Sequence, residues 1–186
     1  MNNTCIAILV GFVALVTSAV AFPFALRFAK KHGIVDNPNA RKLQRVPVPV
    51  FGGVVVYSGI LVGGLVLMTL MPNATLTWGL LGMTVMMIIG TWDDIRGLSV
   101  AIRFLIEILL VLVFIFSTGV YIDDMHGLLG VHSLDPWVGI PFSVFAGVGI
   151  INAVNLIDGV DGYSSGYGMM ACTCFAIAFW AVWSPV

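Results

Sequence analysis

The stretch TCIAILVGFVALVTSAVAFPFAL, residues 4–26, contains no charged side chain. It is slightly longer than the ~20 apolar residues that a helix needs to cross a bilayer. No basic residue precedes it, whereas a cleaved signal peptide has a basic start and a shorter apolar core. The stretch therefore predicts a first transmembrane helix.

The rest of the sequence is equally apolar, with 60% hydrophobic and 9% charged residues and a mean hydropathy of +1.07. Soluble domains use about 45–50% apolar and about 25% charged residues. Apolar runs and the turn signals between them predict spans near residues 4–26, 49–71, 76–92, 100–121, 136–157 and 162–183. We therefore expect an all-α, polytopic membrane helix bundle, formed as a single domain over residues 1–186.

The basic residues are segregated to one side of these spans. Lys and Arg accumulate in cytoplasmic loops, and the connections 72–75 and 122–135 contain neither. All 8 lie in the first loop, after the third span or at the start of the fourth: Arg27, Lys30, Lys31, Arg41, Lys42, Arg45, Arg96 and Arg103. This pattern predicts an external N-terminus. It also predicts that the first loop and segments 91–96 and 158–161 share the cytoplasmic face.

Two carboxylate pairs fall on that face, Asp93 with Asp94 and Asp158 with Asp161. Carboxylates bind Mg²⁺, which usually bridges to phosphates, and basic side chains bind phosphates directly. The combination favours a site at which Mg²⁺ offsets the repulsion between a phosphorylated substrate and the acids.

The residues before the second pair strengthen this interpretation. Asn152, Asn155 and Asp158 are spaced by three and lie on one flank of the fifth span, and amide oxygens are suitable ligands for a hard cation. Gly159 and Gly162 allow the backbone to turn sharply. The alternative is that the acids only mark helix ends and turns, where Asp and Gly are common. Their expected convergence on one face favours the site.

The other polar residues suggest no chemistry. Glu107 lies four residues after Arg103, and this spacing predicts an intramembrane ion pair near the cytoplasmic end of the fourth span, where that span begins. The remaining acids lie in the outer loop, the histidines are isolated, and the cysteines lie in apolar runs, where free Cys behaves as a small hydrophobe. These residues are Asp123, Asp124, Asp135, His32, His126, His132, Cys5, Cys172 and Cys174.

Three segments together resemble the polyprenyl-phosphate N-acetylhexosamine-1-phosphate transferase family, also called glycosyltransferase family 4. They are GIVDNPNARKLQRVPVPVFGG (33–53), GTWDDIRGLSVAIRF (90–104) and NAVNLIDGVDG (152–162). The resemblance implies attack of a polyprenyl phosphate on the β-phosphate of a UDP-N-acetylhexosamine, which yields a polyprenyl-diphosphate sugar and UMP. It implies Mg²⁺ as cofactor, with Mn²⁺ as an alternative.

The same resemblance implies the biological setting. The lipid would be undecaprenyl phosphate and the default sugar N-acetylglucosamine, and the reaction would start cell-envelope polysaccharide synthesis at the cytoplasmic face of the bacterial inner membrane. A homodimer is an alternative to a single copy of the chain, and a nucleic-acid partner is not expected.

The resemblance also assigns roles near the lipid phosphate. Asp93 and Asp94 match an aspartate pair associated with handling, and deprotonating, the lipid phosphate. Lys42, with Arg41 beside it, matches a basic loop that receives this phosphate.

Further roles follow for the end of the fifth span. Asn155 matches a magnesium ligand, whereas Asp158 and Asp161 match residues of the nucleotide site, with Asp161 nearer the uridine. Asn152 is counted with the substrate-binding residues.

Two departures from the family stand out. Many relatives have His where this chain has Gln44, which cannot take a positive charge. Relatives are also much longer, and their second half supplies a further magnesium-binding Asp and a loop with His and Arg. We therefore expect a fragment or a truncated product, and a non-catalytic membrane fragment remains an alternative. A cation or proton transporter is the other alternative, because intramembrane acids mark ion paths.

Overall fold

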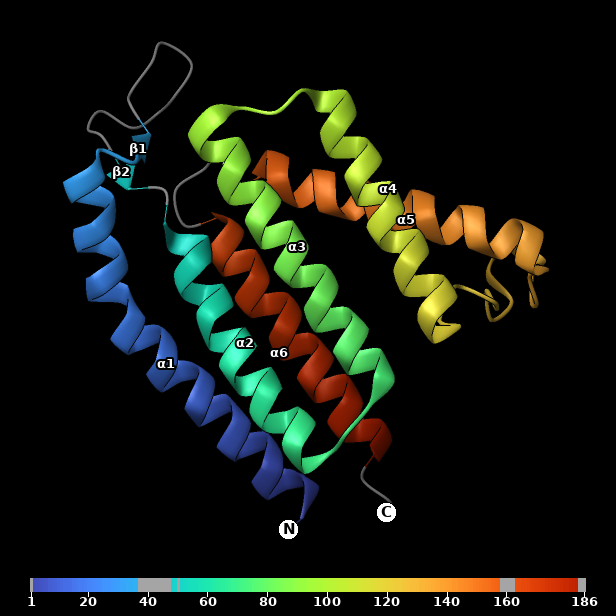
Figure 1. The fold of residues 1–186 in the computed structure, drawn as a ribbon. Helices are drawn as coiled ribbons and strands as arrows, with labels where there is room; N and C mark the ends of the chain where they lie inside the picture. Colours follow the sequence, from blue (N-terminus) through green and yellow to red (C-terminus); the bar gives the residue numbers. More distant parts are fainter. Residues whose placement is uncertain (1, 37–47, 50, 158–162, 184–186) are drawn as a thin grey trace.

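The computed structural model describes residues 2–36, 48–49, 51–157 and 163–183, and six long α-helices account for most of them (Figure 1). All six are long and apolar enough to cross a membrane. The predicted all-α, multi-pass membrane bundle is therefore confirmed. The helices are α1 (Asn3–His32), α2 (Gly52–Leu70), α3 (Ala74–Arg96), α4 (Val100–Thr118), α5 (Pro136–Ile157) and α6 (Tyr163–Trp183).

Small elements not predicted from the sequence complete the described part of the fold. The two-residue strands β1 (Val35–Asp36) and β2 (Val48–Pro49) pair antiparallel after α1. A short 3₁₀ helix, η1 (Leu128–Gly130), lies between α4 and α5.

Two helices run past their predicted ends. The first span was predicted to stop at residue 26, but α1 continues to His32, since its basic last turn interacts favourably with the helix dipole. Gly33 then ends it in the left-handed conformation, at φ 65°. The third span was predicted to stop at residue 92, but α3 continues to Arg96. Asp93 and Asp94 consequently lie in the last turn of a helix rather than in a loop.

Close packing of α1 on α2 depends on small residues. A Cβ atom added to Gly59 would lie 2.6 Å from the carbonyl oxygen of Ala14, so no larger side chain fits there without separating the helices. The Ser18 hydroxyl donates to the Val55 carbonyl across the same contact, at 3.2 Å. Small residues of this kind let transmembrane backbones approach each other.

The remaining contacts follow the chain, with α2 on α3, α3 on α4 and α4 on α5. In Figure 1, α1 and α3 end at the end of the bundle where α2 and α4 begin, and α5 crosses α4. This arrangement brings the end of α3, the start of α4 and the later part of α5 together.

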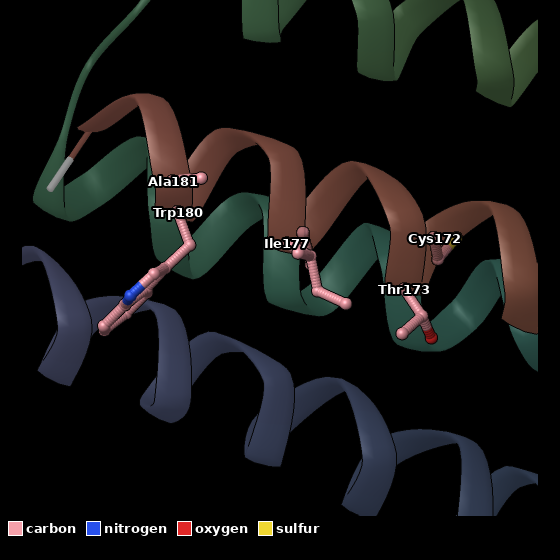
Figure 2. A pocket seen from close by; sticks show the side chains of 6 residues that line it. Cys172, Thr173, Ile177, Trp180 and Ala181 are labelled. Carbon is pink, nitrogen blue, oxygen red and sulfur yellow. The ribbon is translucent and has the colours of Figure 1, made fainter.

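The last helix, α6, is the most exposed. It overlaps α2 and α3 in Figure 1, yet its main tertiary contacts are with α5, and none of its most apolar window is buried. A groove of about 560 Å³ along it is lined by α6 alone (Figure 2). The lining residues are Cys172, Thr173, Ala176, Ile177, Trp180 and Ala181.

Candidate functional site

A single guanidinium joins three helices where α3 ends and α4 begins. Arg103 lies in the first turns of α4, whose start is capped by the Ser99 hydroxyl. Its Nη1 lies 3.5 Å from Oδ2 of Asp93 on α3. Its Nη2 donates to Oδ1 of Asn152 on α5, at 3.2 Å. The rigid fork of arginine suits such simultaneous contacts.

The third nitrogen of Arg103 faces a buried acid. Nε lies 3.7 Å from Oε1 of Glu107, one turn further along α4, and the Glu107 side chain is only 2% exposed. The other carboxylate oxygen of Glu107 accepts a short hydrogen bond from Nδ2 of Asn152. The predicted ion pair between Arg103 and Glu107 is thus confirmed. We call Asp93, Arg103, Glu107 and Asn152 the Arg103 cluster.

Asp93 is held by the loop that follows it as well as by Arg103. Its Oδ1 accepts from the backbone N–H of Leu98 at 2.6 Å, and its carbonyl accepts from the N–H of Gly97 at 2.8 Å. Gly97 makes this turn with a φ of 71°. Both carboxylate oxygens of Asp93 therefore have partners, and its side chain is 25% exposed.

The other acid of the pair faces outward. Asp94 is exposed in the same last turn of α3. Two residues later, the Arg96 guanidinium lies over the Trp92 ring, 5.2 Å from its centre. The end of α3 consequently presents one partly buried and one exposed carboxylate.

The predicted residues on α5 are divided in a similar way. Asn152 is half-buried and belongs to the Arg103 cluster, whereas Asn155, one turn later, is exposed near the helix end. Asp93 and Asn152 both contact Arg103, so the end of α3 lies next to the later part of α5. The predicted convergence with segment 158–161 falls outside the described residues. Within the described ranges, no group of three or more His, Cys, Asp or Glu residues could hold a metal ion. The predicted site residues Arg41, Lys42, Asp158 and Asp161 lie outside the described residues.

An apolar groove of about 530 Å³ lies between α4 and α5, beside the Arg103 cluster. Phe104 lines it next to Arg103 in the chain, and Val148 lines it one turn before Asn152. A ligand with a polar head and an apolar tail could therefore bind here, with its head at the Arg103 cluster and its tail in the groove.

Sequence reasoning missed the bridging role of Arg103. The spacing of four residues predicted its pair with Glu107, but not the contacts with Asp93 and Asn152. One signal in the sequence was the expected position of each residue along its span, because Arg103 and Asn152 lie near the same predicted membrane face. The transporter alternative gains no support here, since Glu107 is occupied by Arg103 and Asn152.

The family model of glycosyl transferase family 4 matches residues 76–185, a range that includes the whole Arg103 cluster. The chain belongs to glycosyl transferase family 4. The resemblance that the three segments indicated is thereby confirmed at the level of the family.

Several curated bacterial proteins are similar to this family 4 chain. It is 32% identical over 179 residues to a probable undecaprenyl-phosphate N-acetylglucosaminyl 1-phosphate transferase of Bacillus subtilis (strain 168), a match covering 95% of this chain and 49% of the relative. It is 33% identical over 162 residues to undecaprenyl-phosphate alpha-N-acetylglucosaminyl 1-phosphate transferase of Escherichia coli (strain K12), covering 86% and 42%. A phospho-N-acetylmuramoyl-pentapeptide-transferase of Staphylococcus carnosus (strain TM300) is 26% identical over 188 residues, covering 92% and 58%.

The chain spans about half the length of the curated relatives that it matches. No solved structure matches it significantly.

Proposed function

We propose that the protein transfers N-acetylhexosamine-1-phosphate, by default that of N-acetylglucosamine, from a UDP-sugar to undecaprenyl phosphate. A phosphate oxygen of the lipid attacks the β-phosphorus, the bond between this phosphorus and the bridging oxygen to the α-phosphate breaks, and UMP leaves. The observation that carries the proposal is the family match over the segment that holds the acid pair and the Arg103 cluster. The product would start cell-envelope polysaccharide synthesis.

We assign different tasks to the two acids at the end of α3. Asp94 is exposed, so its carboxylate can reach the lipid phosphate and accept a proton from it. Asp93 contacts the N–H of Leu98 and the guanidinium of Arg103, so it orients the turn that carries Asp94.

The metal proposed is Mg²⁺, with Mn²⁺ as the alternative. The exposed candidates on α3 and α5, Asp94 and Asn155, offer carboxylate and amide oxygens, which are the donors that these hard cations prefer. Asn155 would hold the ion. When bound, the ion would offset the negative charge of the diphosphate.

The remaining substrate contacts are proposed from the sequence. Arg41 and Lys42 would bind the lipid phosphate, and Asp158 and Asp161 would line the nucleotide site. The isoprenoid tail would lie along the apolar groove between α4 and α5, whose walls adjoin the Arg103 cluster. The segregation of Lys and Arg favours the cytoplasmic face of the bacterial inner membrane.

The direct test is UMP release by the purified full protein from UDP-N-acetylglucosamine. Release should require both undecaprenyl phosphate and Mg²⁺ and should stop with EDTA. Asp94→Asn should lower turnover by about 10²-fold or more, the scale of a lost acid–base or electrostatic contribution. The matched control is Asp135→Asn in the outer connection, which should leave turnover unchanged. Lipid-independent release, or equal turnover in both variants, would contradict the proposal.

A further inference from the structure

Among the described residues, Glu107 is the one buried charged side chain, and the proposed reaction gives it no direct role. It lies one turn from Arg103 along α4, and its two oxygens face different helices. Oε1 faces Arg103 of α4 at 3.7 Å, and Oε2 accepts from Asn152 of α5. Glu107 therefore contacts both Arg103 of α4 and Asn152 of α5, the two residues that connect these helices to Asp93.

The contacts around Glu107 form a closed ring. Arg103 donates to Oδ1 of Asn152 at 3.2 Å, Asn152 donates to Glu107, and Glu107 faces Arg103 again. Each side chain of the ring is thus oriented by the other two. Asp93 lies outside the ring and contacts it through Nη1 of Arg103.

The two carboxylates share one guanidinium almost equally. Arg103 lies 3.5 Å from Asp93 and 3.7 Å from Glu107. Its buried Nε has no hydrogen-bond partner within the part of the chain that the structure describes. The charge of Glu107, rather than a hydrogen bond, holds that side of the guanidinium. Without this charge the guanidinium would move toward Asp93, the other carboxylate that it contacts.

We infer that Glu107 is a positioning residue for the acid pair, because it draws Arg103 away from Asp93 and so fixes the turn that presents Asp94. The inference rests on the proposed function. A guanidinium fully paired with Asp93 would compete with the hydrogen bond from the Leu98 N–H to Asp93, and that bond connects the end of α3 to the turn after it. The reaction step would then slow, with little change in nucleotide binding.

Two substitutions of Glu107 separate charge from shape. Glu107→Gln keeps the size but loses the charge, and its amide offers one acceptor where the carboxylate has two. Glu107→Asp keeps the charge but is one methylene shorter. A positioning role through charge predicts that the Gln variant is the slower enzyme, whereas a pure packing role predicts the reverse.

The experiment measures kcat and KM for UDP-N-acetylglucosamine with the full protein at saturating undecaprenyl phosphate. Glu107→Gln should lower kcat at least about 10-fold, which corresponds to about 1.4 kcal/mol. Its KM should stay within about 3-fold, because the loss falls on the reaction step. Glu107→Asp should retain more of the kcat. The matched control is Ser143→Ala, which removes a buried hydroxyl that bonds to Ile122 and Gly139, and it should leave both constants near the original.

The kcat values of these variants distinguish a failure of the inference from a failure of the proposed function. Equal or higher kcat in Glu107→Gln than in Glu107→Asp would overturn the inference while leaving the proposed function intact. Absence of UMP release from the unsubstituted protein would overturn the proposed function and the inference with it. Where Glu107→Gln does not fold, the double variant Arg103→Gln/Glu107→Gln removes both charges. Without the guanidinium nothing can pair too closely with Asp93, so a kcat near the original in that double variant would support the inference, and a kcat at least about 10-fold lower would overturn it.

Discussion

Replacing Arg103 by Gln should destabilise the bundle strongly, because it leaves Glu107 buried without its counter-charge. Glu107 is 2% exposed, so water cannot replace the lost partner. Removing one member of a buried ion pair costs about 3–5 kcal/mol. Arg103 itself is 25% exposed, which places the expected loss near the lower end, at about 3 kcal/mol.

The contact between Arg103 and Asp93 adds little to this figure. Both side chains are 25% exposed and the atoms lie 3.5 Å apart, so screening by water limits the pair to about 1 kcal/mol or less. The lost hydrogen bond from Arg103 to Asn152 contributes in the same direction. The loss therefore comes mainly from Glu107.

The assay is thermal unfolding of the purified full protein in detergent. Unfolding is monitored as the loss of the monodisperse peak in size-exclusion chromatography after heating. A loss of about 3 kcal/mol should lower the midpoint by about 6–12 °C for a chain of this size. The double variant Arg103→Gln/Glu107→Gln removes both charges and should recover to within about 1 kcal/mol of the original protein. A double variant no more stable than Arg103→Gln alone would refute the reasoning.

Two further predictions concern packing and topology. Gly59→Val should lower stability by about 1–3 kcal/mol by separating α1 from α2, and the same thermal assay should find Gly11→Val, where an added Cβ meets no atom within 4 Å, unaffected. A reporter fused near Ile95 should be cytoplasmic and one near Gly130 external, and finding both on the same side would contradict the assignment of sides from Lys and Arg.

Hydropathy and charge were sufficient to predict the membrane helices, because a bilayer demands long apolar segments whose backbone groups are satisfied internally. The exact ends of the helices were harder to predict. The extension of α1 to His32 and of α3 to Arg96 depends on capping at Gly33 and Gly97, where a left-handed or turn conformation ends the helix. Polar residues in those last turns had suggested loops instead.

The candidate site was predicted only in part for a related reason. The sequence indicated that Asp93 and Asn152 lie near one membrane face, and they do meet. The sequence did not indicate that Arg103 bridges them, because this depends on how α3, α4 and α5 are rotated about their axes. Periodicity predicts the face of one helix, whereas the rotation of three helices depends on packing between them.

The short connection between α3 and α4 also bears on how the protein enters the membrane during synthesis. Asp93 binds the Leu98 N–H and Ser99 caps the start of α4, so the turn closes with contacts that need nothing after Thr118. The two helices can accordingly pack against each other before α5 is made. Arg103 and Glu107 lie one turn apart on α4, so they can pair within that helix and neither charge has to lie in the membrane without a partner. Asn152 reaches them later, when α5 is made, and completes the polar ring inside the membrane.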